Sequence, residues 1–514
     1  MSTLFQTPKT PNHAGLAVLV GAGPRAEGLL TREGEKWLRR CDCVIYDRLV
    51  NQAFLEYVPP GAEKIDVGKS PDHHPVPQER INDLLAAKVR EGKLVVRLKG
   101  GDPLIFGRGG EEIDALHNAG LAFRIVPGVT AAVAAGAYAG VSLTDRRRAA
   151  TVAFVTGHED PAKEDPAVNY AALAGIDTVV FYMGVARLGA ICRQLIDAGK
   201  NPDTPAVAVE NATTPRQRTI RATLATLPAV AQAEALQAPA IVIVGEVAAT
   251  TESWNWFERL PLAGKCVLVT RSRTQASQLA ERLAEYGADV LEAPTVEITP
   301  PENWAELDAA LRRATKFDWL VLTSPNGAEA VLGRLEKLEL DARALAGVKI
   351  AALGEGTART LHAGGLRADF IPEEFTTEAL GSELVLQGLA GRRVLLARSD
   401  IAPAEFAHTL SAAGAAVTAV TAYCTRRPAS LSEAARDALQ AGRVDWITFT
   451  SSSTVENFVA LAGESALRQF RGRTAVIGPT TADALRRFGA EPTVVARPHT
   501  IDALVQAMVE NITL

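Results

Sequence analysis

Short apolar runs alternate with longer segments of helical periodicity over almost the whole chain. The runs Leu16–Val20, Val44–Tyr46 and Leu94–Val96 have the composition of buried strands. Thr31 is a good N-cap, and a helical segment follows it. Strands that alternate with helices predict an α/β fold throughout.

The second half of the chain contains an internal repeat. Cys266–Ser272 recurs 127 residues later as Arg393–Ser399, and Trp319–Ser324 recurs at the same spacing as Trp446–Ser451. Each unit consists of strand, helix, strand and glycine loop, and Ser, Thr, Asn and Gly recur in the loops that follow the strands. The repeat predicts two similar lobes, each with a parallel sheet and with hydroxyl-rich loops at the strand ends.

Length and composition define the class of protein. At 514 residues the chain is too long for one hydrophobic core, so three or more lobes are expected. Its hydrophobic content of 47% is that of a soluble globular protein, and its net charge of −5 argues against a general nucleic-acid surface. The five cysteines include no CxxC pair, and Cys41 and Cys43 are expected to be buried on opposite faces of a sheet. No signal peptide is recognisable and the apolar runs are too short to span a bilayer, so a cytoplasmic location is expected.

The stretch Arg97–Glu112, RLKGGDPLIFGRGGEE, has the composition of a ligand-binding loop. It follows a buried strand and leads into a helical segment. Gly100 and Gly101 allow a left-handed backbone or a close approach to a ligand, and Asp102 places a carboxylate in a turn. A phosphate-binding P-loop would end in Gly-Lys-Ser or Gly-Lys-Thr, which this stretch lacks. We therefore predict a ligand site of another kind at this loop.

The N-terminal strand leads into a pattern that allows an alternative function. Gly21–Ala26 fits GxGxxA, and Asp47 lies at about the distance expected of a ribose-binding acid in a dinucleotide fold. A nicotinamide-dependent dehydrogenase is therefore one alternative. Pro24 argues against it, because proline has no N–H for a pyrophosphate. A dehydrogenase would also have no need of the second glycine loop at 100–110.

A series of further motifs in a fixed order extends over residues 16–247. They include Tyr46–Val50, Val126–Ala132, Thr156–His158 and Phe181–Gly184, together with the glycine loop. In these motifs the chain closely resembles the uroporphyrinogen-III C-methyltransferases, within the wider family of tetrapyrrole methylases. The resemblance implies a two-lobed methylase fold that uses S-adenosylmethionine and no metal. Carried over position by position, it implies cofactor contacts at Pro24, Gly100, Gly101, Asp102, Ile105, Thr130, Ala131, Met183 and Ala212.

The same resemblance implies that Asp47 is the general base and Lys69 the proton donor, and we expect Arg146 to bind substrate. A sulfonium methyl group is already activated, so the enzyme need only hold a carbon nucleophile in line with it. A pyrrole carbon becomes nucleophilic as its ring nitrogen loses a proton, and a carboxylate at a strand end can accept that proton.

The chain departs from the family pattern at several of these motifs. Arg25, Ser70 and Asp145 stand where the family usually has Gly, Arg and His. An acid in place of a histidine adds negative charge beside a polyanionic substrate, which disfavours binding. The positive charges of Arg146–Arg148 can offset this effect. These departures leave an alternative open, in which the methylase half is a binding or regulatory module with impaired turnover.

The second half resembles uroporphyrinogen-III synthase over roughly residues 263–514. The motifs that carry this resemblance are Val269–Arg271, Thr323–Gly327 and Ile477–Ala482. It implies ring closure of hydroxymethylbilane to uroporphyrinogen III with inversion of the last ring, in a task that is mainly conformational. Substrate contacts are expected at Arg271, Ser324, Asn326, Arg398, Arg426, Ser451, Ser452 and Thr480.

Tyr423 breaks the symmetry of the repeat, since its repeat mate is Val296. By the resemblance it lies where the chain crosses between the two lobes. A phenol at this place could protonate or hydrogen-bond the departing hydroxyl group of the linear tetrapyrrole. A tyrosine that only packs at the lobe junction is the alternative.

The two resemblances imply a fused enzyme that makes uroporphyrinogen III and methylates it to precorrin-2, towards sirohaem or cobalamin. The substrates and products are small tetrapyrroles, neither nucleic acid nor a membrane is expected, and the family implies a homodimer through the methylase half. Trp254, Trp256 and Phe257 are expected to pack on one of the lobes. The expected parts are a tail at 1–13, a methyltransferase at 14–248 with lobes at about 14–135 and 136–248, a linker at 249–262, and a synthase at 263–514 with one lobe at about 263–297 plus 428–514 and the other at about 298–427.

Overall fold

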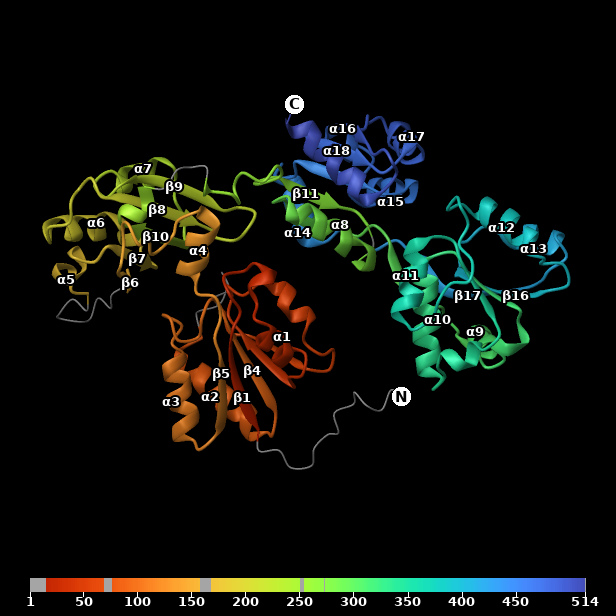
Figure 1. Ribbon diagram of the computed structural model, residues 1–514, viewed down its shortest axis with the longest axis horizontal. Coiled ribbons are helices and arrows are strands. Elements are labelled where there is room, and N and C mark those ends of the chain that lie inside the picture. Colours follow the sequence, from red (N-terminus) through yellow and green to blue (C-terminus); the bar gives the residue numbers. More distant parts are fainter. Residues whose placement is uncertain (1–14, 69–75, 158–167, 250–253, 272, 514) are drawn as a thin grey trace. The chain divides into compact units, whose positions relative to one another are not determined.

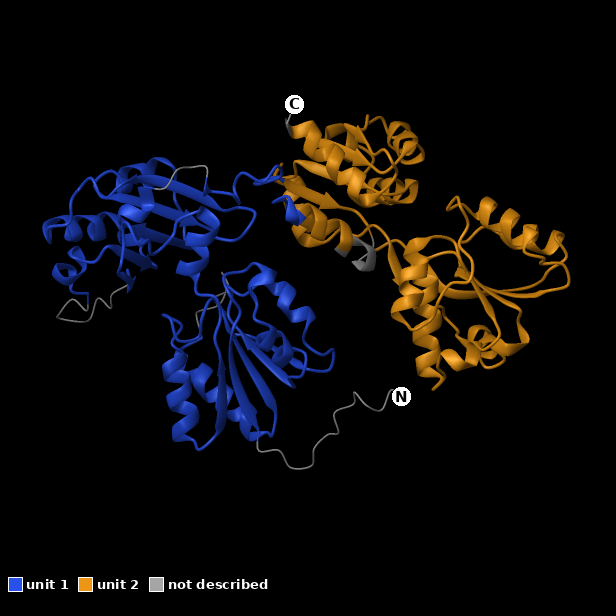
Figure 2. Cartoon of the chain, in the orientation of Figure 1, with its two compact units in different colours: residues 1–265, 284–289 blue, residues 266–283, 290–514 orange. Residues whose placement is uncertain are grey.

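The computed structural model describes residues 15–68, 76–157, 168–249, 254–271 and 273–513 (Figure 1). The chain divides into two compact units, residues 1–265 with 284–289 and residues 266–283 with 290–514 (Figure 2). The described strands form four five-stranded sheets with helices between the strands. The predicted α/β class is therefore confirmed.

The first sheet is parallel throughout, in the order β3-β2-β4-β1-β5. Helix α1 covers one face of the sheet, and α2 and α3 cover the other. Thr31 caps α1 by accepting a hydrogen bond from Gly34 N–H, and Cys41 and Cys43 are buried on opposite faces, both as predicted. Because the strands are parallel, their carboxyl ends share one edge, where open α/β sheets bind ligands. The elements are β1 (Leu16–Gly21), α1 (Arg32–Leu38), β2 (Cys43–Tyr46), β3 (Glu63–Asp66), α2 (Gln78–Arg90), β4 (Leu94–Lys99), α3 (Gly109–Asn118) and β5 (Ala122–Val126).

The second sheet, in the order β6-β7-β10-β8-β9, is mixed. Only β6 and β7 are parallel; β10 pairs antiparallel with β7 and β8, and β8 pairs antiparallel with β9. Tyr138 of α4 packs against Trp256 and Phe257 at ring-centroid distances of 5.2 and 4.9 Å, so these linker aromatics lie on this lobe, as expected. The elements are α4 (Ala131–Ala139), β6 (Val152–Thr156), α5 (Tyr170–Ala174), β7 (Thr178–Tyr182), α6 (Leu188–Asp197), β8 (Pro205–Glu210), β9 (Arg218–Thr223), α7 (Leu227–Ala233) and β10 (Ala240–Val244).

The second unit contains the third sheet, β12-β11-β18-β19-β20, and the fourth, β13-β17-β16-β14-β15. The elements of the third are β11 (Cys266–Val269), α8 (Arg273–Glu285), β12 (Asp289–Glu292), α14 (Glu433–Gln440), β18 (Trp446–Phe449), α15 (Ser452–Ala462), α16 (Ala466–Gln469), β19 (Arg473–Val476), α17 (Pro479–Arg487), β20 (Val494–Val495) and α18 (Ile501–Thr513). Those of the fourth are β13 (Glu297–Thr299), α9 (Ala305–Leu311), β14 (Trp319–Leu322), α10 (Pro325–Lys337), β15 (Lys349–Ala352), α11 (Glu355–Ala363), α12 (Thr377–Leu386), β16 (Arg393–Ser399), α13 (Glu405–Ala412) and β17 (Ala416–Arg426).

The internal repeat explains the order of the strands in these two sheets. The first repeat supplies β11, β12, β14 and β15, and the second supplies β16, β17, β18 and β19. The order β12-β11-β18-β19 in the third sheet matches β17-β16-β14-β15 in the fourth. Each sheet therefore combines the first half of one repeat with the second half of the other. The antiparallel pairing of β13 with β17 is a feature that the repeat did not indicate.

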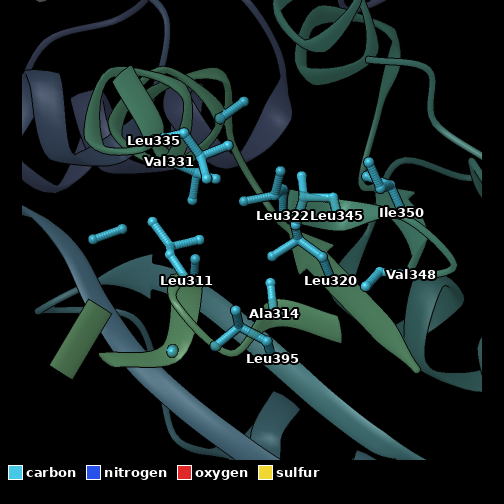
Figure 3. Close-up of a cluster of buried hydrophobic side chains, with 14 of the residues drawn as sticks. Leu311, Ala314, Leu320, Leu322, Val331, Leu335, Leu345, Val348, Ile350 and Leu395 are labelled. Atoms are coloured by element: carbon cyan, nitrogen blue, oxygen red, sulfur yellow. The ribbon is translucent and has the colours of Figure 1, made fainter. Parts of the chain in front are cut away.

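A buried aliphatic cluster supports one face of the fourth sheet (Figure 3). Leu311 of α9 and Val331 and Leu335 of α10 pack against Leu320 and Leu322 of β14. Leu, Val and Ala dominate the cluster, as is usual where a helix covers a parallel sheet. Among the described residues, no helix combines the length and the apolar character needed to cross a bilayer.

Candidate active sites

Close backbone contacts hold the glycine loop after β4 against the ends of β1 and β5. Gly23 and Gly101 exchange both backbone hydrogen bonds, at 3.1 and 2.9 Å, and Gly101 has a φ of +68°. A Cβ atom on Gly128 would lie 2.2 Å from the carbonyl oxygen of Gly101, and one on Gly21 would lie 2.5 Å from Gly128 N. Three chain segments therefore meet at a distance that leaves no room for a side chain.

Asp102, predicted as a cofactor contact, uses both carboxylate oxygens to fix this loop. One oxygen accepts from Leu104 N–H at 2.8 Å and the other from Gly128 N–H at 3.0 Å. The loop beyond it leaves Leu104, Ile105 and Phe106 exposed. Large apolar side chains gathered at one exposed loop commonly mark a binding surface.

Tyr182, at the end of β7, joins the second sheet to the start of α4. Its hydroxyl accepts from Ala132 N–H at 3.1 Å and lies 2.6 Å from Thr130 Oγ1. Its ring lies 4.9 Å from that of Phe106 in the glycine loop, and burial raises the pKa of the phenol. The predicted residues Thr130 and Ala131 thus adjoin the glycine loop through a tyrosine that sequence reasoning missed. The signal was a polar aromatic residue at the end of an otherwise apolar strand.

The predicted contacts Met183 and Ala212 lie in loops with strained backbone. Met183 is exposed and has a φ of +54°, and the neighbours of Ala212, Asn211 and Thr213, have φ of +48° and +69°. Positive φ at non-glycine residues is costly and clusters at functional sites. Thr213 Oγ1 donates to the carbonyl oxygen of Pro24 at 2.8 Å, which places the 211–213 loop against the turn after β1.

The departures from the family pattern have different structural consequences. Arg25 has a φ of +101°, a conformation that favours glycine, and its pKa is lowered by burial and by the nearby charges of Arg216 and Arg48. Asp145 accepts hydrogen bonds from the side chain of Arg147, which lowers the pKa of the carboxyl to about 2. The carboxylate is therefore ionised, and Arg147 balances its negative charge within the same turn.

Three predicted or departing positions remain. Arg146 is exposed in the turn between Asp145 and Ala149. Lys69, the expected proton donor, and Ser70 lie outside the described residues.

Asp47, the expected general base, stands at the carboxyl end of β2 and is bound by a buried arginine. Arg97 Nη2 lies 2.6 Å from Asp47 Oδ1, and Arg97 Nε lies 2.9 Å from Glu112 Oε1. Lys99 Nζ lies 2.9 Å from the same oxygen of Glu112. The side chains of Arg97 and Glu112 are 1% and 0% exposed, whereas that of Asp47 is 33% exposed. The carboxylate of Asp47 is thus accessible to solvent but fixed from the interior by Arg97.

The charges of this network sum to zero, and burial and the neighbouring charges shift the pKa values of Arg97 and Lys99. Burial acts to lower the pKa of Arg97, but the charges of Asp47 and Glu112 outweigh it and raise that pKa. The pKa of Lys99 is lowered by burial and by the charge of Arg97. Glu112 Oε1 also accepts from Gln78 Nε2 at 3.2 Å, while Oε2 is buried without a hydrogen-bond partner among the described residues. The feature of the sequence that could have indicated this network is a pair of cationic residues, Arg97 and Lys99, within an otherwise apolar strand.

In the second unit, the predicted hydroxyl residues lie where strands meet helix N-termini. Ser324 caps α10 by accepting from Gly327 N–H at 3.1 Å, and its repeat mate Ser451 caps α15. Asn326 is buried in the first turn of α10. Ser452 Oγ donates to the carbonyl oxygen of Thr480 at 3.1 Å.

Two of the predicted arginines, Arg398 and Arg426, already have partners within the lobe. Arg398 Nη1 donates to the carbonyl oxygens of Ala402 and Pro403, at 3.2 and 2.8 Å. Arg426 forms an ion pair with Asp400, and burial lowers the pKa of Arg271. Arg398 also lines a pocket of about 390 Å³, together with Thr323, Thr377, Leu396 and Phe406.

Tyr423 lies on β17 within hydrogen-bond distance of the cap of α10. Its hydroxyl is 2.9 Å from Ser324 Oγ. Because Ser324 Oγ accepts from Gly327 N–H, the serine hydroxyl proton can be donated to the phenol oxygen. The structure thus brings together two of the residues that the sequence selected separately.

Replacing Gly128 by Ala tests the packing of the glycine loop. The added methyl group must displace the carbonyl of Gly101, so we expect binding of S-adenosylmethionine to weaken at least tenfold while the unit stays folded. Gly110→Ala is the matched control, because a Cβ there meets no atom within 4 Å. Calorimetric titration would contradict this account if both variants bound equally well.

Replacing Glu112 by Gln tests the buried network. The variant leaves Arg97 and Lys99 buried with one fewer countercharge, which we expect to lower the free energy of unfolding by about 3–5 kcal/mol. Glu63→Gln is the control, because its ion pairs with Lys88 and Lys93 lie at the opposite, solvated end of the same sheet and contribute about 0–1 kcal/mol. Urea unfolding, monitored by hydrogen exchange of amides in the first unit, would measure the free energy of unfolding of both variants. Similar losses in Glu112→Gln and Glu63→Gln would show that the buried network stabilises the unit no more than a surface ion pair does.

Comparison with known proteins confirms the family resemblance of each half of the chain. Residues 17–228 match the tetrapyrrole (corrin/porphyrin) methylases, and residues 277–506 match uroporphyrinogen-III synthase HemD. The first match includes Gly21–Ala26 and therefore decides against the dehydrogenase alternative.

Several relatives are similar over different lengths. The siroheme synthase of Tolumonas auensis is 46% identical over 252 residues, which is 49% of this chain and 53% of that protein, so the chain spans about half of that relative. The solved structure of uroporphyrin-III C-methyltransferase from Thermus thermophilus complexed with S-adenyl homocysteine is 37% identical, with a TM-score of 0.39, and covers 46% of this chain and 94% of its own. The porphyrin biosynthesis protein HemD of Ruminiclostridium josui is 39% identical over 499 residues, which is 96% of this chain and 98% of that protein. The chain therefore belongs to the family of this porphyrin biosynthesis protein and joins a tetrapyrrole methylase domain to a uroporphyrinogen-III synthase domain.

Proposed function

We propose that the synthase half closes hydroxymethylbilane to uroporphyrinogen III and that the methylase half methylates this product twice, with S-adenosylmethionine, to precorrin-2. The observation that carries the methylase part is the meeting of Asp47, the glycine loop and the start of α4 at the carboxyl edge of one parallel sheet. The product would enter the sirohaem or cobalamin branch. A homodimer formed by the methylase half and a cytoplasmic location belong to the same proposal.

The residues around the glycine loop suit an adenosyl cofactor. Gly100 is open, because a Cβ there would meet only Leu49, and Ile105 and Met183 are exposed apolar side chains next to backbone in unusual conformations. Small residues and exposed apolar groups fit a nucleoside with a thioether better than long charged side chains do. S-adenosylmethionine supplies an activated methyl group when it is bound. The residues proposed to hold it are Pro24, Gly100, Gly101, Asp102, Ile105, Thr130, Ala131, Met183 and Ala212.

Asp47 is proposed to remove the pyrrole proton as methylation proceeds. Arg97 donates to one oxygen of its carboxylate and fixes its direction, while the exposed part of the side chain remains open to substrate. A fixed base reduces the number of orientations that the reacting groups must sample. The proton donor is proposed to be Lys69, and Arg146 is proposed to bind a substrate carboxylate.

In the synthase half, the work is proposed to be mainly positional. Loss of water from a hydroxymethylpyrrole is intrinsically easy, so the protein must hold the chain such that the correct carbon attacks. The first turn of α15 begins with Ser452 and Ser453, whose N–H groups suit a carboxylate, whereas α10 begins with Pro325, which has no N–H. Tyr423, next to Ser324, is proposed to assist the departing hydroxyl.

The whole proposal is tested by supplying the protein with hydroxymethylbilane and S-adenosylmethionine. We expect uroporphyrinogen III first and a dimethylated product afterwards, detected by chromatography and mass spectrometry. If S-adenosylmethionine binds but supplied uroporphyrinogen III is not methylated, the methylase half is a binding module instead.

Replacing Asp47 by Asn separates the two activities. Asparagine keeps the shape but cannot accept the proton, so methylation of supplied uroporphyrinogen III is expected to fall about 10²–10⁴-fold with ring closure unchanged. Asp42→Asn, at the opposite end of β2, is the control, because in the part of the chain that the structure describes its carboxylate accepts from the backbone N–H of Leu94 and contacts no residue of the glycine loop. An Asp47→Asn enzyme with normal methylation would remove this residue from the role of base.

Replacing Tyr423 by Phe removes one oxygen from the synthase site. We expect ring closure to slow by about 10²-fold or less, because one positioned donor is lost. Uncatalysed closure gives the symmetric isomer, so the share of uroporphyrinogen I should rise in the product. Methylation of supplied uroporphyrinogen III serves as the internal control. A variant with a normal rate and a normal isomer ratio would leave Tyr423 as a packing residue.

A further inference from the structure

Strand β17 contains a bulge immediately before Tyr423. Arg398 pairs with Thr421 and Ser399 pairs with Tyr423, which leaves Ala422 as an extra residue on β17. Ala422 and Tyr423 both pack against the same buried cluster beneath α10, although consecutive residues of a regular strand point to opposite faces. The bulge therefore turns Tyr423 toward α10, and bulges often redirect a side chain in this way.

Asp400 continues the pairing of β17 beyond the bulge, where β16 has already ended. The chain turns after Ser399, whose carbonyl oxygen accepts from Ala402 N–H at 3.2 Å. Asp400 N–H donates to the carbonyl oxygen of Tyr423 at 3.1 Å, and its carboxylate accepts from Thr425 N–H at 2.9 Å. One residue thus supplies the donor and the acceptor that a longer β16 would have supplied.

Two side chains hold the carboxylate of Asp400 in place. Ser399 Oγ donates to Oδ1 at 3.1 Å, and the guanidinium of Arg426 pairs with Oδ2. Burial acts to raise the pKa of Asp400, but the hydrogen bonds from Arg426 and Thr425 outweigh it and lower the pKa to about 2. The ion pair is therefore present at neutral pH.

The segment that Asp400 holds is also the one that joins this lobe to the rest of the unit. Thr425 and Arg426 pair with Ile298 and Glu297 of β13 in the antiparallel sense. The incoming and outgoing chains thus form one short ribbon, and Asp400 ties that ribbon to the end of β16. Without this tie, the part of β17 that follows the bulge would still pair with β13 but would no longer be fixed to the end of β16.

We propose that Asp400 is a positioning residue of the synthase, whose carboxylate fixes the end of β17 so that the Tyr423 hydroxyl stays at Ser324. The proposal rests on the role in ring closure proposed above for Tyr423. Asp400 itself does not touch the phenol; it acts through the backbone of Tyr423 and that of Thr425, two residues further along the strand.

Graded variants of Asp400 in the full chain test the proposal. Asp400→Ala removes the acceptor and the ion pair, so we expect kcat for ring closure to fall about tenfold or more, with a smaller change in KM and a larger share of uroporphyrinogen I. Asp400→Asn keeps an acceptor for Thr425 N–H and is expected to recover part of the rate. Should Asp400→Ala fail to fold, Arg426→Gln removes the same ion pair from its other side.

Asp341→Asn is the matched control. Asp341 pairs with Arg343 in the same lobe and its pKa is also lowered to about 2 by that arginine, but its carboxylate caps the short helix Ala342–Leu345 instead of bonding the end of β17. We expect its rate and isomer ratio to equal those of the unaltered protein. Thermal unfolding of every variant would separate loss of fold from loss of position.

The double variant Asp400→Ala with Tyr423→Phe distinguishes the positioning role of Asp400 from the proposed role of Tyr423 in ring closure. If Asp400 acts through Tyr423, the double variant should be no slower than the slower of the two single variants. Losses that multiply, or a normal rate and isomer ratio in Asp400→Ala, would overturn the positioning role. A normal Tyr423→Phe enzyme would instead overturn the role of the tyrosine, and with it any action of Asp400 through the phenol.

Discussion

The methylase half depends on one buried ion pair, between Arg97 of β4 and Glu112 of α3. Arg97 and Lys99 are two residues apart on a strand, so both point to the face that α3 covers, and Glu112 meets both. Without Glu112, two buried cations would face one carboxylate. With it, Arg97 can reach past the end of β2 and hold Asp47. A buried network in which every charged side chain has a countercharge is costly to assemble but rigid once formed, which suits the proposed base, Asp47.

Sequence reasoning could find the loops of this site but not the network behind them. Glycines mark positions such as Gly101 directly, because only a special backbone requires them, and a resemblance carries over residues that lie in motifs. Arg97, Lys99 and Glu112 lie in a motif too, yet their partnership depends on which face α3 covers and on the register between β2 and β4. Tyr182 escaped notice for the same reason, since its partners lie 50 and 52 residues away.

In the synthase half, the internal repeat explains the arrangement of strands and helices, and the proposed catalytic tyrosine lies where the two repeats differ. The repeat gives Ser324 and Ser451 the same place at the start of a helix, and both cap it. The two repeats differ at Tyr423, because its repeat mate is Val296 and because it follows a bulge in β17. No pattern in the sequence announces that bulge, because from Val420 to Thr425 buried and partly exposed residues still alternate as in a regular strand. The contacts of Asp400 reveal it, because they replace the pairing that β16 no longer provides.

Arg25 shows how a loop can keep its path while its chemistry changes. Its φ of +101° would cost a glycine nothing and costs another residue about 1–3 kcal/mol. The turn nevertheless holds, because Asn51 Nδ2 donates to the carbonyl oxygen of Arg25 at 2.8 Å and Thr213 Oγ1 bonds the residues on either side, Pro24 and Ala26. Those contacts involve only the backbone of the turn and would be the same for glycine. The substitution therefore leaves the geometry at Pro24 intact and adds a cation near Arg48 and Arg216, in an enzyme whose substrate is a polyanion.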